Sequence, residues 1–262
     1  DGFVMPMAIE KEITMLAQLR PDRKVKAYSL DYDQILEFDL ENLEYDEENI
    51  WVNYIKGVID EIQKLGESLQ GFNLMFTGNV PQGSGLSSSA ALEVVTALAV
   101  TDLHKIKIKG VEMALLAQRA ENNFVGVQCG IMDQYISRLG KKDHALLIDC
   151  RTNDYELVPF KNDAYQIVIC NSKVERGLVD SEYNQRRSEC NQAVEFFAER
   201  EDDKITALRD VDLKTVEKYK DELAENVYKR AHHVVSENAR VIESQKALEA
   251  DNMQKFGDLM YA

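Results

Sequence analysis

A glycine- and serine-rich stretch at residues 81–91, PQGSGLSSSAA, carries groups suited to phosphate binding. It follows a predicted strand at 72–80 and precedes a very apolar predicted helix at 90–103. Glycines allow close backbone approach, and the unpaired N–H groups and positive dipole end at a helix start attract anions. A serine hydroxyl there can also ligate magnesium. The stretch therefore predicts a phosphate cradle, although a glycine-rich turn with serine caps fits the same residues.

Two well-known phosphate-binding patterns do not describe this loop. The Gly-Lys-Ser/Thr ending of a Walker A loop is absent from residues 81–91. The third glycine of the Rossmann fingerprint is absent as well. A different class of nucleotide-binding loop is therefore indicated.

Two carboxylates further along the chain could complete a phosphoryl-transfer site. Glu121 lies on the last turn of a helix predicted at 111–124, and Asp133 lies in the first turn of a helix predicted at 131–139. The glycine-containing loop at 125–130 would fold one toward the other, so that one could hold a metal while the other takes a hydroxyl proton. In the alternative interpretation Glu121 is a solvated helix-end acid and Asp133 a favourable first-turn charge.

Hydrophobic periodicity predicts the elements that must position these residues. The pattern at 8–19 fits either a helix or a strand, and we favour a strand. We expect a hairpin from 24–30 and 34–40 and an amphipathic helix at 51–65. Strands are predicted at 144–150, 155–160 and 165–171, and nearly everything after residue 181 is predicted to be helical. The change in character divides the chain into an α/β domain at 1–172 and a helical part at 173–262.

Composition excludes several classes of function. The 262 residues include 31 Lys and Arg against 46 Asp and Glu, a net charge of −15 that disfavours nucleic acid or an anionic membrane as partner. No apolar run approaches the roughly 20 residues that cross a bilayer, and the start does not resemble a signal peptide. The four cysteines lack metal-binding spacing. We expect a soluble, cytoplasmic protein with reduced thiols.

The pattern PxGxGLSSSA at 81–90 resembles the second motif of the GHMP small-molecule kinases. Four further blocks resemble the galactokinases among them: GFVMPMA at 2–8, CGIMDQ at 129–134, LLIDCR at 146–151 and SEYNQRR at 181–187. The resemblance runs over the whole chain. It implies the α+β GHMP kinase fold, with an N-terminal part like ribosomal protein S5 domain 2, a mixed sheet plus helices, and a helical C-terminal part.

The resemblance also implies an activity, namely ATP-dependent phosphorylation of the anomeric hydroxyl of galactose to galactose 1-phosphate in the Leloir pathway of galactose metabolism. Asp133 would contact the sugar as catalytic proton acceptor, Gly130 and Tyr183 would line the galactose pocket, and Ser89 and Glu121 would hold Mg²⁺. The expected ATP-binding residues are Gly83, Ser84, Gly85, Leu86, Ser87, Ser88, Ser89, Ser29 and Trp51. Plain packing roles remain the alternatives for Trp51 and Tyr183.

Two segments of the galactokinase pattern are missing, one before residue 1 with the form GRxNLIGEHxDY and one glycine-rich motif toward the C-terminus. We therefore expect a galactokinase truncated at both ends, inactive or nearly so by itself, whose native form is a monomer. A kinase for N-acetylgalactosamine or another sugar is one alternative. A non-catalytic galactose and ATP sensor is another, but residues 87–91 keep the Ser-Ala part that such sensors lack. A helical interaction module at 181–262 is a third.

Overall fold

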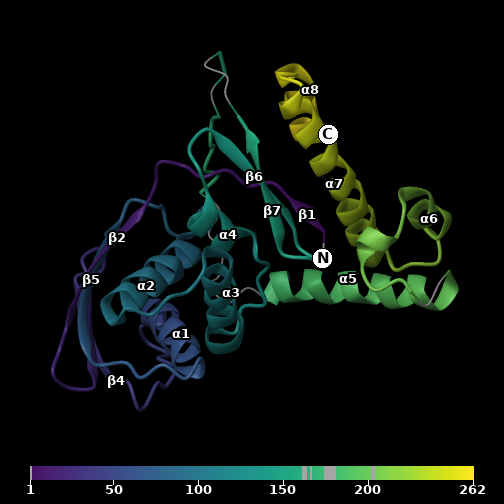
Figure 1. Cartoon of the computed structure of the whole chain (residues 1–262). Helices are drawn as coiled ribbons and strands as arrows, with labels where there is room; N and C mark the ends of the chain where they lie inside the picture. The colour runs from purple at the N-terminus through teal and green to yellow at the C-terminus, as the bar shows by residue number, and fades with distance from the viewer. Residues whose placement is uncertain (1, 161–163, 166, 174–180, 202–203) are drawn as a thin grey trace. The chain divides into compact units, whose positions relative to one another are not determined.

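A computed structural model describes residues 2–160, 164–165, 167–173, 181–201 and 204–262 (Figure 1). For residues 181–183 it describes the backbone but not the side chains. The chain forms two compact units. The first contains Ile9–Leu139 and the described part of 167–179, and the second contains the described parts of 1–8, 140–166 and 180–262. The sequence predicts a single boundary between residues 172 and 173. The structure divides the chain differently, because residues 144–159 belong to the same unit as the C-terminal helices.

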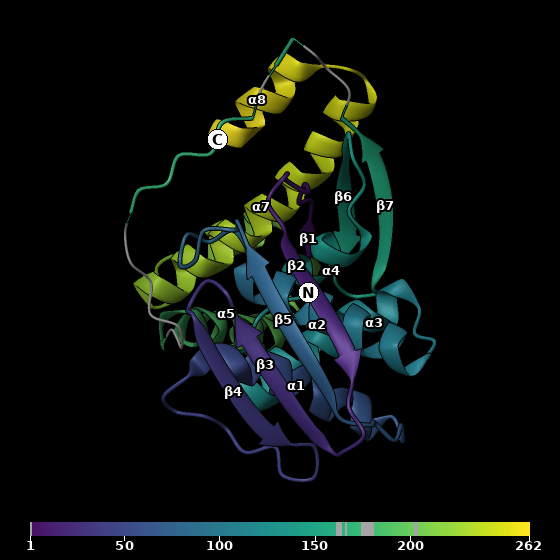
Figure 2. The ribbon, with the colours of Figure 1, turned by 90° about the vertical axis from the view of Figure 1, so that its left-hand side faces the viewer.

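A four-stranded sheet forms one layer of the first unit (Figure 2). Its strands are β2 (Ile13–Leu19), β3 (Lys24–Ser29), β4 (Gln34–Asp39) and β5 (Phe72–Gly78), in the order β2-β5-β3-β4. β3 and β5 run parallel, whereas the β2–β5 and β3–β4 pairs are antiparallel. The expected strand within 8–19, the hairpin and the mixed sheet are therefore confirmed.

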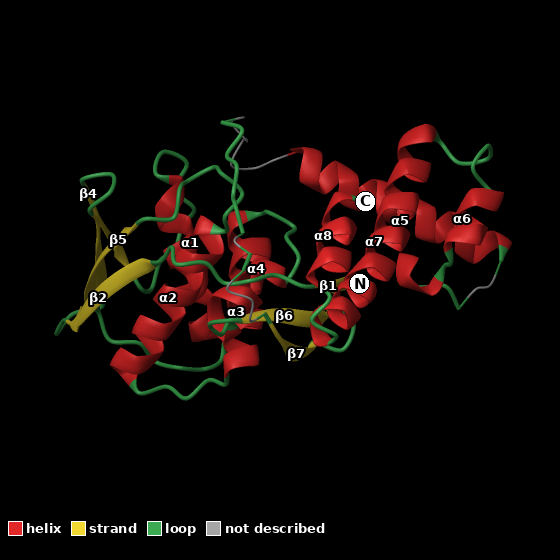
Figure 3. Ribbon diagram, turned by 90° about the horizontal axis from the view of Figure 1, so that it is seen from above, coloured by secondary structure: helices red, strands yellow, loops and turns green. Residues whose placement is uncertain are grey.

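Helices cover one face of this sheet (Figure 3). They are α1 (Ile50–Lys64), α2 (Ser88–His104), α3 (Gly110–Ala120) and α4 (Met132–Leu139), with a π-helical turn at Glu121–Val125 directly after α3. Strand β3 alternates between buried Val25 and Ala27 and exposed lysines, so its apolar side chains face the helices. The same core takes in Ile55 and Ile59 from the apolar stripe of α1.

The second unit combines a small antiparallel sheet with helices. Strands β1 (Phe3–Val4), β6 (His144–Asp149) and β7 (Asp154–Pro159) pair in the order β1-β6-β7. The helices are α5 (Ser181–Arg200), a 3₁₀ turn (Leu208–Asp210), α6 (Leu213–Lys218), α7 (Glu225–Glu249) and α8 (Met253–Tyr261). Two expected strands and the helical C-terminal part are confirmed. Throughout the described ranges, no helix has both the length and the apolar character that crossing a membrane requires.

The third strand expected at 165–171 is wrong for the residues that the structure describes. Tyr165 and residues 167–171 carry no strand. Ile167, Val168 and Ile169 are 50%, 77% and 51% exposed. Their β-branched pattern predicts a strand, but a strand is stable only where a neighbouring strand completes its hydrogen bonds. The local sequence indicates a preference for strand, but it does not show whether a neighbouring strand is available to pair with.

Candidate active site

The loop between β5 and α2 has a backbone that its glycines make possible. Gly83 and Gly85 have φ angles of 63° and 76°, in the left-handed region that glycine adopts without steric cost. A Cβ atom at Gly83 would meet nothing within 4 Å, so the loop is open there. The Ser84 hydroxyl donates a hydrogen bond to the Pro81 carbonyl oxygen at 2.6 Å, which closes the turn. The result is a tight loop that an external group can approach.

Ser87 joins this loop to α2 and points to Asp133. It also has a left-handed backbone, with φ of 61°, which is costly for a residue with a Cβ atom. Although Ser87 is the N-cap residue of α2, its side chain makes no capping hydrogen bond. The hydroxyl instead lies close enough to the Asp133 carboxylate to lower its pKa. The left-handed backbone of Ser87 thus goes with a hydroxyl placed beside that carboxylate.

Asp133 occupies the first turn of α4, beside Ser87 of the glycine loop. Burial raises the pKa of the Asp133 carboxyl, and the nearby Ser87 hydroxyl opposes part of that rise by favouring the ionised form. An ionised Asp133 is a hydrogen-bond acceptor at the edge of the loop. It can therefore orient a hydroxyl group and accept its proton.

Glu121 is brought to the same loop by an irregular helix end. The chain leaves α3 through the π-helical turn, which ends at Gly126 with φ of 90°. Glu121 is only 6% exposed, so the alternative of a solvated helix-end acid is wrong. Burial raises the pKa of the Glu121 carboxyl, and the nearby Ser89 hydroxyl lowers it in part. The two residues expected to hold magnesium thus lie side by side.

Glu93 and Gln134 extend this polar cluster and escaped the sequence analysis. The Gln134 side-chain nitrogen donates to Glu93 Oε2 at 3.0 Å and to Glu121 Oε2 at 2.7 Å. The Cys129 thiol also donates to Glu121 Oε2, at 3.3 Å. Burial, and next the charge of Glu121, raise the pKa of Glu93 well above its ordinary value. One signal was available, since Glu93 is the only charged residue between 90 and 101 in an otherwise apolar helix.

The residues expected near adenine adjoin the glycine loop through Tyr32. The Trp51 ring stacks on the Tyr32 ring, with centroids 6.3 Å apart and planes 14° from parallel. The Tyr32 hydroxyl donates to Gln82 Oε1 in the loop, and its backbone N–H donates to the Ser29 hydroxyl oxygen at 3.4 Å. Ser29 is fully buried, whereas Tyr32 is 46% exposed. Tyr32, which the sequence analysis did not select, therefore connects both expected residues to the loop.

The two residues expected to line a sugar pocket are placed differently. Gly130 is exposed in the segment directly before α4, three positions from Asp133. Tyr183 lies in α5 of the second unit, and its side chain is outside the described residues. The structure therefore brings Gly130 to the neighbourhood of Asp133 along the chain and gives no position for the Tyr183 ring.

A magnesium ion fits the donors at the loop in part. Among the described residues, no group of three or more His, Cys, Asp or Glu side chains could hold a metal. Ser89 and Glu121 offer a hydroxyl and a carboxylate side by side. Magnesium prefers oxygen ligands and is commonly bound by one or two protein groups together with water and substrate phosphates. The pair suits that second mode of binding.

Comparisons with known proteins identify the family of the chain. Residues 53–141 match the family model for the GHMP kinases N terminal domain. Galactokinase from Lactococcus lactis, solved in complex with galactose, shares 38% identity with a TM-score of 0.92, covering 98% of this chain and 67% of that one. The fold is shared by two more distant kinases. A heptose 1-phosphate kinase from Bacteroides thetaiotaomicron has 15% identity and a TM-score of 0.61, with 98% of this chain and 68% of that chain covered. A phosphomevalonate kinase from Streptococcus pneumoniae has 12% identity and a TM-score of 0.58, with 98% and 70% covered.

Proposed function

The chain belongs to the galactokinase family of the GHMP kinases, and from that premise we propose that it transfers the γ-phosphoryl group of ATP to the anomeric hydroxyl of galactose. The products are galactose 1-phosphate and ADP. One observation carries the assignment to this site, namely the position of the Asp133 carboxylate beside Ser87 at the glycine loop. It places a proton acceptor next to a phosphate-binding loop.

Residues 83–89 bind the triphosphate in this proposal, through Gly83, Ser84, Gly85, Leu86, Ser87, Ser88 and Ser89. Gly83 and Gly85 have left-handed backbones, and the open space at Gly83 permits phosphate oxygens to approach the backbone. The start of α2 contributes N–H groups and the positive end of its dipole. The loop thereby fixes the γ-phosphorus for in-line attack.

Asp133 acts on the attacking hydroxyl. Phosphoryl transfer proceeds through a loose transition state that needs little activation of the nucleophile. The carboxylate therefore has two tasks, to orient the anomeric oxygen and to accept its proton as the bond to phosphorus forms. The nearby Ser87 hydroxyl supports both, because it favours the ionised carboxylate.

Ser89 and Glu121 would hold Mg²⁺, which would neutralise charge on the phosphate oxygens. Their proximity and the burial of Glu121 support this role. Ser29 and Trp51 belong to the adenine side, supported by their link to the loop through Tyr32. Gly130 and Tyr183 belong to the sugar side in the same proposal. A monomer in the cytoplasm, with galactose and ATP as its small-molecule partners, completes it.

The test is galactose-dependent release of ADP by the full-length protein, compared with Asp133→Asn. We expect the variant to lose about 10²-fold or more in kcat, the range typical of a general base, while galactose and ATP still bind. Asp258→Asn is a matched control, because Asp258 is an exposed residue of α8.

Other outcomes point elsewhere. Binding of both substrates without turnover in the wild type would indicate the sensor and contradict the enzyme. Turnover of N-acetylgalactosamine in preference to galactose would replace the substrate and leave the reaction in place. Full activity in Asp133→Asn would show that Asp133 is not the group that accepts the proton of the anomeric hydroxyl.

A further inference from the structure

Glu93 is a buried acidic residue whose position is not explained by the packing of the fold. It lies on α2 with no exposed surface, among apolar residues of the helix. Burying a carboxyl group costs free energy unless specific partners compensate. The hydrogen-bond partner that the structure gives it is the side-chain amide of Gln134 on α4. A leucine would fill a helix face of this kind with less cost, which points to a task for the acid.

The Gln134 amide connects Glu93 to Glu121. Its nitrogen carries two hydrogens, and the two carboxylate oxygens lie at 3.0 Å and 2.7 Å from it, one from each acid. Gln134 is itself fully buried, so water does not compete for these bonds. The amide therefore fixes one oxygen of Glu121 relative to α2.

Two buried oxygens in this pair have no hydrogen-bond partner in the structure, Glu93 Oε1 and Gln134 Oε1. Unpaired buried polar atoms are rare, and each one lowers the stability of the folded state. Retaining two of them beside a functional carboxylate is a stability cost that packing does not explain. The arrangement is suited to holding Glu121 still.

We propose that Glu93 and Gln134 are positioning residues, in which the Gln134 amide, held by Glu93, orients the Glu121 carboxylate toward the metal–nucleotide complex. This inference rests on the proposed function, because it assigns Glu121 to the metal. Groups that orient metal ligands without touching the metal commonly change affinity when they are removed. Neither residue contacts substrate in this role.

The test compares Glu93→Gln with Glu93→Leu, and adds Gln134→Met. Glutamine keeps an oxygen that accepts the Gln134 N–H and offers an N–H to the unpaired Gln134 oxygen. Leucine keeps the volume and removes the acceptor, and methionine removes both donated bonds of Gln134. The primary measurement is the dissociation constant of Mn²⁺ in the presence of a non-hydrolysable ATP analogue, followed by electron paramagnetic resonance.

We expect Glu93→Leu and Gln134→Met to weaken Mn²⁺ binding about 10-fold or more, and Glu93→Gln to stay near the wild type. The kcat should fall with the metal affinity, while the KM for galactose remains at the wild-type value. The double variant Glu93→Leu with Gln134→Met should lose no more than either single variant, because both changes break one chain of contacts.

Wild-type Mn²⁺ affinity in both Glu93→Leu and Gln134→Met would overturn the proposal. Equal losses in Glu93→Gln and Glu93→Leu would overturn it too, since the acceptor would then be irrelevant. If Glu93→Leu does not fold, Gln134→Met and Glu93→Gln still decide between these outcomes.

Thr96→Val is the matched control for the helix. Thr96 is equally buried on α2, and its hydroxyl bonds only the Leu92 carbonyl oxygen within that helix. We expect wild-type Mn²⁺ affinity in this variant. A loss there equal to that of Glu93→Leu would attribute the effect to packing of α2 and contradict the proposal.

The two proposals fail in different ways. If the wild type binds Mn²⁺ with the nucleotide but releases no ADP with galactose, the proposed function is wrong while the metal measurement still tests Glu93 and Gln134. If the wild type binds no Mn²⁺ with the nucleotide, both proposals are wrong.

Discussion

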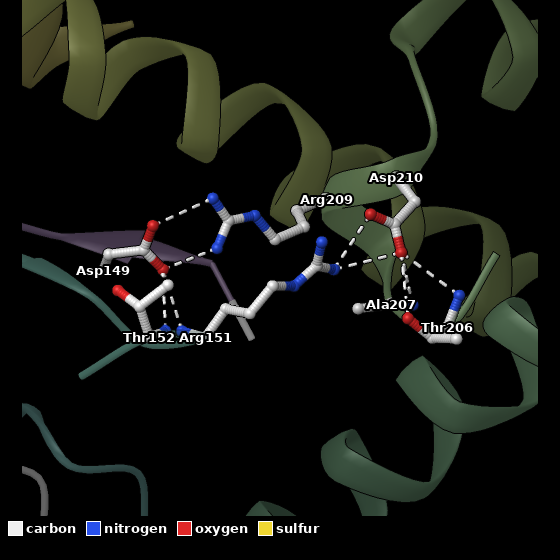
Figure 4. Close-up of polar contacts among 7 residues, drawn as sticks. All are labelled: Asp149, Arg151, Thr152, Thr206, Ala207, Arg209 and Asp210. Carbon is white, nitrogen blue, oxygen red and sulfur yellow. Dashed lines mark hydrogen bonds and ion pairs between the residues drawn. The ribbon is translucent and has the colours of Figure 1, made fainter. Parts of the chain in front are cut away.

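Arg209 and Asp149 form a two-pronged ion pair that joins the 3₁₀ turn to the end of β6 (Figure 4). Arg209 Nη1 lies 2.6 Å from Asp149 Oδ1, and Nη2 lies 3.1 Å from Oδ2. The guanidinium carbon also lies 4.3 Å from the centre of the Phe3 ring. Asp149 further accepts the backbone N–H of Arg151 at 2.8 Å. One carboxylate thus shapes the β6–β7 turn and attaches it to the helical part of the second unit.

Asp149→Asn should destabilise the protein at neutral pH. The Arg209 guanidinium lowers the pKa of Asp149 from its ordinary value of 3.8 to about 2. Each pKa unit corresponds to about 1.4 kcal/mol, and partial exposure of the pair reduces what is realised, so we expect a loss of about 1–2 kcal/mol. Urea denaturation followed by circular dichroism measures it.

The pH dependence of that loss has a definite sign. A depressed carboxyl pKa stabilises the folded state above the ordinary value of 3.8, and the stabilisation disappears as the pH falls through about 2. The difference between wild type and Asp149→Asn should therefore be constant near neutrality and shrink on acidification. Arg209→Lys, which keeps the charge but not the fork, should show an intermediate loss. A difference that grows at low pH would contradict the assignment to this pair.

The activity should have an acid limb set by Asp133. Burial raises the pKa of this carboxyl above its ordinary 3.8, and only the ionised form accepts a proton. As the pH falls through the raised pKa, kcat/KM for galactose should decrease about tenfold per pH unit, as expected for one essential ionised base. The residual activity of Asp133→Asn should lack this limb. An unchanged limb in that variant would assign the titration to another group.

Thiol reactivity should separate Cys170 from Cys129. Cys170 is exposed, whereas Cys129 is more enclosed, and burial, followed by the negative charge of Glu121, strongly raises the pKa of its thiol. Since the thiolate is the reactive form, iodoacetamide at pH 8 should label Cys170 first and leave Cys129 unlabelled. Mass spectrometry of tryptic peptides gives the two rates, and Cys170→Ser is the control. Rapid labelling of Cys129 would contradict the prediction, because it would show that the reagent reaches a reactive Cys129 thiolate.

Sequence reasoning selected most of the residues of the candidate site but not how they are held together. Residue type and spacing single out 81–91 as a phosphate-binding candidate, and the family resemblance adds the expected role of Asp133. The sequence does not predict the π-helical turn at Glu121–Val125, since residue types do not mark where a helical turn takes in one extra residue. The position of Ser87 beside Asp133 likewise depends on how α2 and α4 pack.

Glu93 shows a second limit of sequence reasoning. A single charged residue in an apolar helix predicts either that its side chain reaches the surface or that it has a buried partner. Hydrophobic periodicity does not distinguish the two. The partner is Gln134, which is 41 positions away along the chain. Residues 167–169 show the converse, because their apolar pattern states a preference for pairing that no described strand satisfies. Contacts between distant segments decide both cases.

Trp51 is the only tryptophan in the chain, so its fluorescence reports on the adenine side of the proposed site. Its ring is 8% exposed, packs against Phe76 with centroids 5.5 Å apart, and stacks on the half-exposed Tyr32. If the base of ATP lies beside these rings, MgATP should change the Trp51 emission in a saturable manner. Tyr32→Ala should weaken nucleotide binding by about 1–2 kcal/mol, because it removes a stacking surface next to the loop.

Isothermal calorimetry supplies the affinities independently of the fluorescence. Tyr28→Phe is the matched control, because the Tyr28 hydroxyl bonds Asp33 and the change removes only that bond. We expect its MgATP affinity to equal that of the wild type. Saturating MgATP that leaves the Trp51 emission unchanged in the wild type, together with normal affinity in Tyr32→Ala, would make Trp51 a core residue only and would place adenine elsewhere.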